Sequence, residues 1–264
     1  MNILFIGDIF SKAGRKAVAN ELPKLLKKQK IDFVIANAEN CTHGRSLNLK
    51  HYNHLKLCGV KCFTFGNHTW ENDQIEDILK QKDTVRPINL KEKSYWSKIG
   101  LGSRLYKIGR KIVRITNVMG MSANAKGIQS NPFLCMDKFL PTIKNKQDIH
   151  IVDFHTNSTS EKVAFFTAYK GMVSAILGTH THVQTADEEI RDNTAYITDV
   201  GMTGPALGII GCQPKTILQM YREEILHFKL DPSESKYQFN AVLLTFNDKT
   251  NKPTKIQRIF IRQK

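Results

Sequence analysis

Eight side chains that could bind a metal ion or transfer a proton lie in five short segments of this 264-residue sequence. Each segment directly follows an apolar run with the composition of a buried strand. The eight residues are Asp8, Glu39, Asn40, Asn67, His68, His155, His180 and His182. Carboxylate, amide and imidazole groups without a thiolate favour Mn, Fe, Zn or Ni over Cu(I) or an iron–sulfur cluster.

Seven of these residues, all except His68, are candidate metal ligands, which is too many for one tetrahedral zinc ion. They match two ions that share a carboxylate bridge, for which Glu39 is the candidate. Paired ions about 3.5–4 Å apart suit phosphoester hydrolysis, because they supply hydroxide near neutral pH and hold the attacking and leaving oxygens. Taken singly, each segment could instead be a turn or a surface histidine pair. The coincidence of all five at strand ends favours the dinuclear site.

The elements that must position these groups alternate between strand and helix in the first third of the chain. The expected strands are Ile3–Ile6, Phe33–Ala36 and Lys61–Phe65, and the expected helices are Lys12–Gln29, Leu49–Leu57 and Asn72–Lys80. This alternation implies parallel strands joined by right-handed crossovers. Because the carboxyl ends of parallel strands meet at one edge, the candidate ligands should lie there together. Glycines directly before Asp8 and Asn67 would let the backbone turn sharply where each strand ends.

The remaining elements predict a second sheet. They are a hairpin at Leu105–Val118 around Gly109, helices at Phe133–Ile143 and Ser160–Tyr169, strands at Ile149–Phe154, Val173–Leu177 and Ala195–Thr198, and a last hairpin formed by Phe239–Phe246 and Lys255–Ile261. The glycine-rich stretch Gly201–Gly211 lacks the P-loop pattern and is interpreted as a loop that borders the site. We expect an α/β fold in one domain over residues 1–264, with two packed sheets and helices outside.

Composition places the chain among folded globular proteins, since 41% of its residues are hydrophobic and 24% are charged. These values exclude intrinsic disorder, collagen-like repeats and coiled coil. We find neither a signal-peptide pattern nor the run of about 18–20 apolar residues that a spanning helix needs. Five scattered cysteines without a C-x-x-C pair are typical of reduced thiols. We therefore expect a cytoplasmic protein with no membrane partner.

The net charge of +15 is spread unevenly, because Lys91–Arg114 and Lys249–Lys264 are strongly basic and the first predicted helix adds several more cations. A solvated, lysine-rich surface would explain this charge. Alternatively, the charge attracts an anionic nucleotide or an RNA end toward the metals. We find no RNA-binding module, and aromatic residues are not interleaved with the basic segments as stacking surfaces require. RNA is therefore a weaker partner candidate than a small phosphoester.

Several strings resemble known motifs. Those that resemble the calcineurin-like metallophosphoesterases are Gly7-Asp8, Gly66-Asn67-His68 and Gly178-Thr179-His180-Thr181-His182. The longer strings Asn37–Asn40, Gly66–Trp70, Gly178–Asp187 and Thr198–Pro205 resemble one branch, the YmdB-like 2′,3′-cyclic-nucleotide phosphodiesterases. Two departures from the superfamily pattern, Phe10 in place of a histidine and Glu39-Asn40 in place of an aspartate motif, are similar to that branch. The resemblance extends from Met1 to about Arg262 and implies a four-layer α/β/β/α sandwich of two mixed sheets with flanking helices.

The resemblance also implies roles for single residues. One ion would be held by Asp8, Glu39, Asn40 and His182, and the other by Glu39, Asn67, His155 and His180. The ions would be iron, with manganese or zinc as alternatives. His68 would protonate the leaving oxygen, for which the ordinary imidazole pKa of about 6.5 is suited. In the alternative interpretation, His68 only orients a neighbour.

We expect a metal-dependent phosphodiesterase that opens 2′,3′-cyclic nucleotides to 3′-phosphates. A metal-bridging hydroxide would attack phosphorus, Asn67 and the ions would hold the phosphate oxygens, and His68 would protonate the leaving ribose oxygen. His43 is a candidate substrate contact or a loop residue, and we expect a homo-oligomer. The cyclic substrate follows from the resemblance alone. Alternatives are a 3′,5′-cyclic nucleotide, a phosphomonoester or an RNA end as substrate, or a regulatory RNA- or protein-binding protein with a secondary metal site.

Overall fold

Two mixed β-sheets form the centre of the computed structural model, which describes residues 1–123, 125, 127–224 and 231–263. The first sheet contains β1 (Asn2–Ile6), β2 (Asp8–Ile9), β3 (Phe33–Asn37), β4 (Cys62–Thr64), β5 (Thr84–Val85), β12 (Met202–Pro205), β13 (Tyr237–Phe246) and β14 (Pro253–Arg262). Its order is β2-β12-β13-β1-β3-β4-β5, with β14 paired to β13. The second sheet contains β6 (Ser103–Ile108), β7 (Lys111–Met119), β8 (Ile149–His155), β9 (Ala175–Thr179), β10 (Glu189–Arg191) and β11 (Thr194–Ile197), in the order β10-β11-β9-β8-β7-β6.

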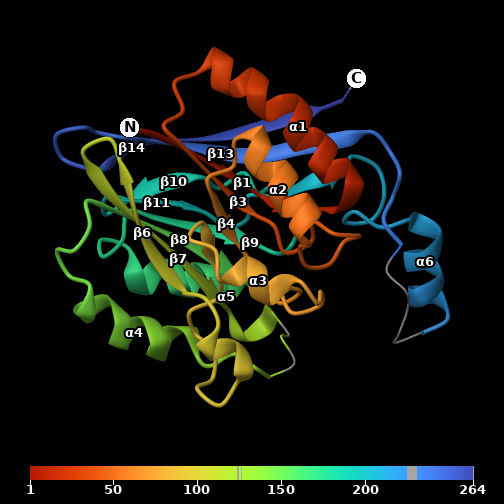
Figure 1. Cartoon of the computed structure of the whole chain (residues 1–264), viewed down its shortest axis with the longest axis horizontal. Helices are drawn as coiled ribbons and strands as arrows, with labels where there is room; N and C mark the ends of the chain where they lie inside the picture. The colour runs from red at the N-terminus through yellow and green to blue at the C-terminus, as the bar shows by residue number, and fades with distance from the viewer. Residues whose placement is uncertain (124, 126, 225–230, 264) are drawn as a thin grey trace.

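Helices cover the outer faces of both sheets, and the last helix lies at the side of the molecule (Figure 1). They are α1 (Ser11–Lys28), α2 (Leu49–Cys58), α3 (Ile75–Leu79), α4 (Pro132–Thr142), α5 (Thr159–Tyr169) and α6 (Pro214–Arg222), with short 3₁₀ turns at Tyr95–Lys98 and Met121–Ala123. The boundaries of α2 follow from its sequence. Asn48 accepts a hydrogen bond from the His51 backbone N–H at 2.8 Å, and Gly59 ends the helix with a left-handed φ of 114°.

Three layers of buried apolar side chains separate four layers of structure. Alternation along β1 sends Ile3 and Phe5 toward the second sheet, and Leu4 and Ile6 toward α1 and α2. On the far side of the second sheet, β8 packs against α5, where the Phe154 and Phe165 rings stack with centroids 3.9 Å apart. Burying one such side chain stabilises the fold by about 1.5–3 kcal/mol. The predicted four-layer α/β/β/α sandwich of two mixed sheets is therefore confirmed.

Parallel pairing brings the carboxyl ends of the strands to one edge, as predicted. Strands β1, β3, β4 and β5 pair in parallel, as do β7, β8, β9 and β11. The antiparallel strand β13 lies beside β1, with Ile3 opposite Leu244. The edge of each sheet that carries the polar residues therefore belongs to neighbouring parallel strands.

Two predicted elements differ from the structure. The stretch Gly201–Gly211 is not all loop, because Met202–Pro205 forms β12 between β2 and β13. Glycine and proline usually interrupt strands, and in this chain β12 ends at Pro205. The third predicted helix begins at Ile75 rather than Asn72, because the Asn72 side chain accepts the Gln74 N–H at 3.0 Å and holds a turn.

The cysteines agree with the prediction of plain thiols, since all five are free. Burial raises the pKa of Cys62 to about 12, so this thiol stays protonated and is a poor metal ligand. Cys58, four residues before it in the sequence, is half-buried in α2. Among the described residues, none of the helices has both the length and the apolar character needed to cross a bilayer.

Candidate metal centre

The seven candidate ligands lie at the carboxyl-end edges of both sheets. Asp8 begins β2 directly after β1, while Glu39 and Asn40 follow β3. Asn67 follows β4, His155 ends β8, and His180 and His182 follow β9. The contacts between candidate ligands described below join residues that are far apart in the sequence, so the packing of the two sheets creates the site.

Four of these residues meet around His155, which is fully buried. Its Nε2 atom lies 3.0 Å from Glu39 Oε1, 3.0 Å from Asn67 Oδ1 and 3.0 Å from His180 Nδ1. The ligand atoms of Glu39, His155 and His180 lie within 4.8 Å of one another. This group contains the four residues that the resemblance assigns to one ion.

A second group forms around His182. Its Nε2 atom lies 3.2 Å from Asn40 Oδ1, and its Nδ1 atom lies 2.9 Å from the Ile210 carbonyl oxygen. Because a carbonyl oxygen only accepts, Nδ1 carries the proton and the Nε2 lone pair faces Asn40. The Asn40 amide nitrogen donates to the Gly44 carbonyl at 2.9 Å, which leaves its oxygen directed at His182.

The burial and hydrogen bonding of Asp8 indicate whether metal ions fit this site. Its side chain is fully buried; Oδ2 accepts the His180 backbone N–H at 3.1 Å, whereas Oδ1 has no hydrogen-bond partner in the described chain. His155 Nδ1 lies 3.8 Å from this Oδ1 atom, which is too far for a hydrogen bond. A buried carboxylate oxygen without a hydrogen bond is costly unless a nearby cation neutralises it. Burial raises the pKa of Asp8 to about 8, against the opposing effect of His155. The oxygen and imidazole donors around it fit divalent metal ions.

Electrostatics couple Glu39 to His155. Burial alone would raise the pKa of Glu39, but the neighbouring imidazole of His155 outweighs burial and holds that pKa well below its usual range. Burial disfavours the charged form of His155, yet Glu39 raises its pKa to about 9. Burial, together with the charge on His155, lowers the pKa of His180 to about 3. Without an ion, the site therefore contains an imidazolium–carboxylate pair beside a neutral imidazole.

The glycines before two ligands serve close packing. A Cβ atom at Gly66 would lie 2.3 Å from the His155 ring and 2.4 Å from Glu39 Oε2, and one at Gly7 would lie 1.9 Å from the Gly201 carbonyl oxygen. Neither Gly7 nor Gly66 has a positive φ. A left-handed backbone is therefore not the reason for these glycines, although a turn does begin at Gly66, whose carbonyl oxygen accepts the Thr69 backbone N–H at 3.4 Å. Space for the ligands and for the second sheet requires these glycines.

Asp153 and Thr179 orient His155 and were not predicted as functional residues. The Thr179 hydroxyl donates to Asp153 Oδ1 at 2.7 Å and lies 2.8 Å from His155 Nδ1. Since its single proton goes to the carboxylate, this hydroxyl accepts from Nδ1–H of His155. Asn37 donates to the other Asp153 oxygen at 3.0 Å. The alternation of strand β8, which puts residues 153 and 155 on the same face, is the sequence signal that could have identified Asp153.

A fully buried ion pair supports the loop that carries His180 and His182. Lys162 Nζ lies 2.7 Å from Asp199 Oδ2, and the same oxygen accepts the Thr181 backbone N–H at 2.9 Å. Both histidines have left-handed φ angles, 102° and 67°, which are strained for side chains with a Cβ. Sequence reasoning missed Lys162, because a lysine in an amphipathic helix is ordinarily exposed.

The structure places the two remaining candidates differently. The His68 backbone N–H donates to Glu39 Oε2 at 2.9 Å, and its ring Nδ1 lies 2.9 Å from Glu71 Oε1. Its ring is therefore held beside the metal centre with Nε2 free of these contacts. His43 is exposed, packs edge-on against His51 and lines a separate cavity of about 460 Å³. Within the described residues, His43 makes no hydrogen bond to the candidate ligands, and its substrate contact stays a prediction.

Comparisons with known proteins cover nearly the whole chain. The model of the YmdB-like protein family matches residues 4–259. A Mycoplasma genitalium protein is 41% identical over 264 residues, which cover 99% of this chain and 93% of that protein. A Bacillus subtilis protein named 2′,3′-cyclic-nucleotide 2′-phosphodiesterase is 38% identical over 263 residues, covering 99% and 97%. A crystal structure described as a novel phosphatase from Mycoplasma pneumoniae has a TM-score of 0.95 and 39% identity, covering 99% and 93%.

These matches confirm the resemblance seen in the motifs. The matched region of the family model begins within β1 and ends within β14, so it includes every candidate ligand. The Bacillus subtilis and Mycoplasma pneumoniae relatives are named a phosphodiesterase and a phosphatase, which are both phosphoric ester hydrolases. The chain therefore belongs to the YmdB-like protein family and is a phosphoric ester hydrolase.

Proposed function

We propose that this protein is a metal-dependent phosphodiesterase that opens 2′,3′-cyclic nucleotides to 3′-phosphates. The observation that supports this most is the convergence of carboxylate, amide and imidazole groups around His155 and His182. One oxygen of buried Asp8 also lacks a hydrogen-bond partner in the part of the chain that the structure describes. The name of the Bacillus subtilis relative supports the cyclic substrate. Iron is the proposed metal, with manganese or zinc as alternatives.

The proposed ligand sets follow the family resemblance, and the contacts around His155 and the His182–Asn40 contact agree with it. Asp8, Glu39, Asn40 and His182 would hold one ion, and Glu39, Asn67, His155 and His180 would hold the other. When bound, two such ions supply a low-pKa water and neutralise charge that develops on the phosphate oxygens. Glu39 would belong to both sets, as the resemblance implies; one of its oxygens lies against His155, and the other accepts the His68 backbone N–H.

Two neighbouring residues would act on the substrate. The Asn67 carbonyl oxygen lies against His155, so its amide N–H groups are free to donate to a phosphate oxygen. His68, oriented by Glu71 through Nδ1, would donate a proton from Nε2 to the leaving oxygen. In the balanced reaction, water forms a new P–O bond, the P–O2′ bond breaks, and the 2′ oxygen receives the proton.

The experiment compares substrates with protein whose metal content is measured by elemental analysis. We expect hydrolysis of 2′,3′-cyclic AMP to the 3′-phosphate, with slower hydrolysis of 3′,5′-cyclic AMP and p-nitrophenyl phosphate. If 3′,5′-cyclic AMP or p-nitrophenyl phosphate is hydrolysed faster than 2′,3′-cyclic AMP, the preferred substrate belongs to that class instead. A metal-loaded protein that hydrolyses none of them, including bis(p-nitrophenyl) phosphate, would overturn the enzymatic role and favour a regulatory binding protein.

A further inference from the structure

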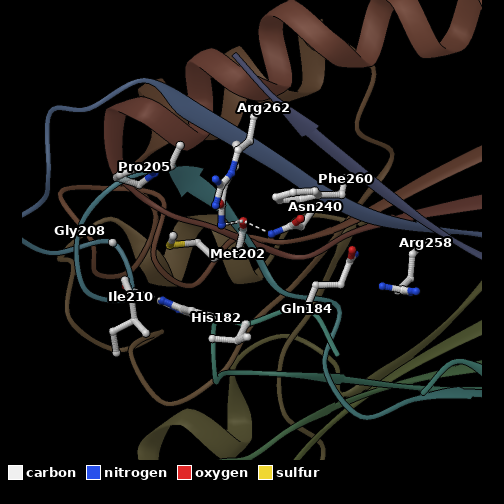
Figure 2. A pocket seen from close by; sticks show the side chains of 14 residues that line it. His182, Gln184, Met202, Pro205, Gly208, Ile210, Asn240, Arg258, Phe260 and Arg262 are labelled. Carbon is white, nitrogen blue, oxygen red and sulfur yellow. Dashed lines mark hydrogen bonds between the residues drawn. The ribbon is translucent and has the colours of Figure 1, made fainter. Parts of the chain in front are cut away.

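A second cavity, of about 430 Å³, adjoins the candidate metal centre at His182 and is not used by the proposed reaction. Its other walls come from the loop after β12 and from strands β13 and β14. Figure 2 shows Arg262 extending from its strand into this cavity, with His182 and Ile210 across it. A molecule in the cavity would therefore lie beside a proposed metal ligand.

One face of β14 supplies an aromatic ring between two guanidinium groups. Arg258, Phe260 and Arg262 alternate along the strand, so they share a face, and all three line the cavity. The Phe260 side chain is 55% exposed, and Arg262 lies 5.3 Å from its ring centroid. The prediction that aromatic residues are not interleaved with the basic segments is therefore wrong at Phe260. Only the strand register shows that these residues surround a cavity.

A buried acceptor also faces this cavity. Asn240 lies opposite Phe260 on β13, lines the cavity and is 1% exposed. Its amide nitrogen donates to the Met202 carbonyl at 2.8 Å, which fixes the orientation of the amide group. Its Oδ1 atom has no hydrogen-bond partner within the described chain. An unpartnered buried acceptor is best satisfied by an N–H or O–H group of a ligand.

The charges in the cavity indicate a second phosphate. Arg258 pairs with Glu188 at 2.7 Å, whereas Arg262 makes no ion pair with any residue that the structure describes. None of the described residues that line the cavity is acidic. A 2′,3′-cyclic mononucleotide carries one phosphate, and that phosphate belongs at the metals. The Arg262 guanidinium could therefore pair with a further phosphate group of a longer ligand.

We propose that this cavity binds the nucleotide that precedes the cyclic phosphate in a short RNA end. Its base stacks on Phe260, the internal phosphodiester pairs with Arg262, and a base or ribose donor reaches Asn240 Oδ1. This inference rests on the proposed function at the metal centre. The reaction is unchanged: water replaces the P–O2′ bond at the terminal cyclic phosphate, and the internal linkage stays intact.

The test measures kcat/KM for 2′,3′-cyclic AMP and for a diadenosine ending in a 2′,3′-cyclic phosphate. A 2′-O-methyl group on its first ribose keeps the internal linkage stable. We expect the dinucleotide to be at least about 10-fold better, mainly through KM, because base stacking and a phosphate contact add to binding. Phe260→Ala and Arg262→Gln should each lower this value about 5-fold or more for the dinucleotide. Both variants should leave cyclic AMP hydrolysis within about twofold, as should the control Lys255→Gln, which removes a cation from the other face of β14.

Calorimetric binding of the dinucleotide product, which ends in a 3′-phosphate, separates this inference from the proposed function. If neither substrate is hydrolysed, the proposed function fails, and weaker product binding by both variants would still locate the nucleotide in the cavity. Equal losses for both substrates would place the reacting nucleotide itself there and overturn the inference. Variants that change neither hydrolysis nor product binding would also overturn it.

Discussion

Two buried histidines on the same strand have opposite electrostatic properties. His150, at the amino end of β8, is 2% exposed and contacts the Thr116 hydroxyl at 2.8 Å, and burial lowers its pKa to about 3. His155, at the carboxyl end, is also buried, but Glu39 raises its pKa to about 9. Burial is common to both residues. The difference comes from the carboxylates that lie beside His155 at the carboxyl end.

This difference shows that the amino and carboxyl ends of the strands have different chemical surroundings. At the amino end of β8, burial and the nearby charge of Arg114 lower the pKa of His150, whose ring contacts a hydroxyl group. At the carboxyl end, loops from both sheets bring carboxylates, amides and imidazoles to one place. Substitutions at the two edges should therefore have different consequences, and the following predictions test that difference from the largest effect to the smallest.

Removing the shared carboxylate should have the largest effect. Glu39→Gln keeps the shape of the side chain but removes the charge that both proposed ion sites use. We expect metal content to fall and kcat/KM to drop by at least about 1000-fold, equivalent to about 4 kcal/mol. Elemental analysis and hydrolysis assays measure both. His150→Gln is the matched control at the other end of β8. Loss of metal in that variant would contradict the conclusion that only the carboxyl end of the strand takes part in metal binding.

Breaking the buried ion pair under the histidine loop should destabilise the protein. Lys162→Met leaves Asp199 charged and buried, which costs about 3–5 kcal/mol. Chemical unfolding measures this free energy. The double variant with Asp199→Asn should recover part of the stability. Breaking the exposed Arg258–Glu188 pair with Arg258→Gln should cost less than about 1 kcal/mol of unfolding free energy. Equal losses for the two pairs would disprove that burial makes the Lys162–Asp199 pair the more costly one to break.

The proton donor should affect turnover without affecting metal content. His68→Asn removes the imidazole, and we expect kcat to fall by about 100-fold or more while both ions stay bound. Glu71→Gln, which removes the acceptor beside Nδ1, should cause a smaller loss. Full turnover in a metal-loaded His68→Asn protein would show that His68 only orients its neighbours.

The smallest effect at neutral pH is expected for His150, which gives stability a pH dependence at the amino edge. The folded-state pKa of His150 is about 3, below the ordinary value of about 6.5, so the unfolded chain binds the proton more tightly. Its stabilising contribution is full above pH 6.5 and is lost as pH falls toward 3, by up to about 1.4 kcal/mol per pH unit. Urea unfolding of metal-free protein and of His150→Gln at pH 6.5, 5.5 and 4.5 isolates this contribution. Parallel pH profiles for both proteins would refute it.

Much of the fold and the site could be predicted because the signals are local. Asp8, Asn67 and His155 each follow a strand that is recognisable by itself, and parallel pairing then brings them together. The strand Met202–Pro205 could not be predicted, since its pairing overrides the turn tendency of Gly204 and Pro205.

Features that depend on contacts between distant segments were also missed. The burial of Lys162 depends on Asp199, which lies 37 residues later. The cavity near His182 depends on the register that puts Asn240 opposite Phe260. Composition and periodicity describe each segment alone, so neither could reveal such partners.

The pairing of β1 with β13 has a consequence for how the protein is made. Strand β1 is synthesised early, but the strand beside it, Tyr237–Phe246, follows more than 200 residues later. Until then β1 has one open edge, and Asp8 at its end lacks part of its surroundings. At about 5–20 residues per second, that delay lasts roughly 10–50 seconds. The first sheet, and with it the surroundings of the proposed metal centre, can therefore be completed only after β13 has been synthesised.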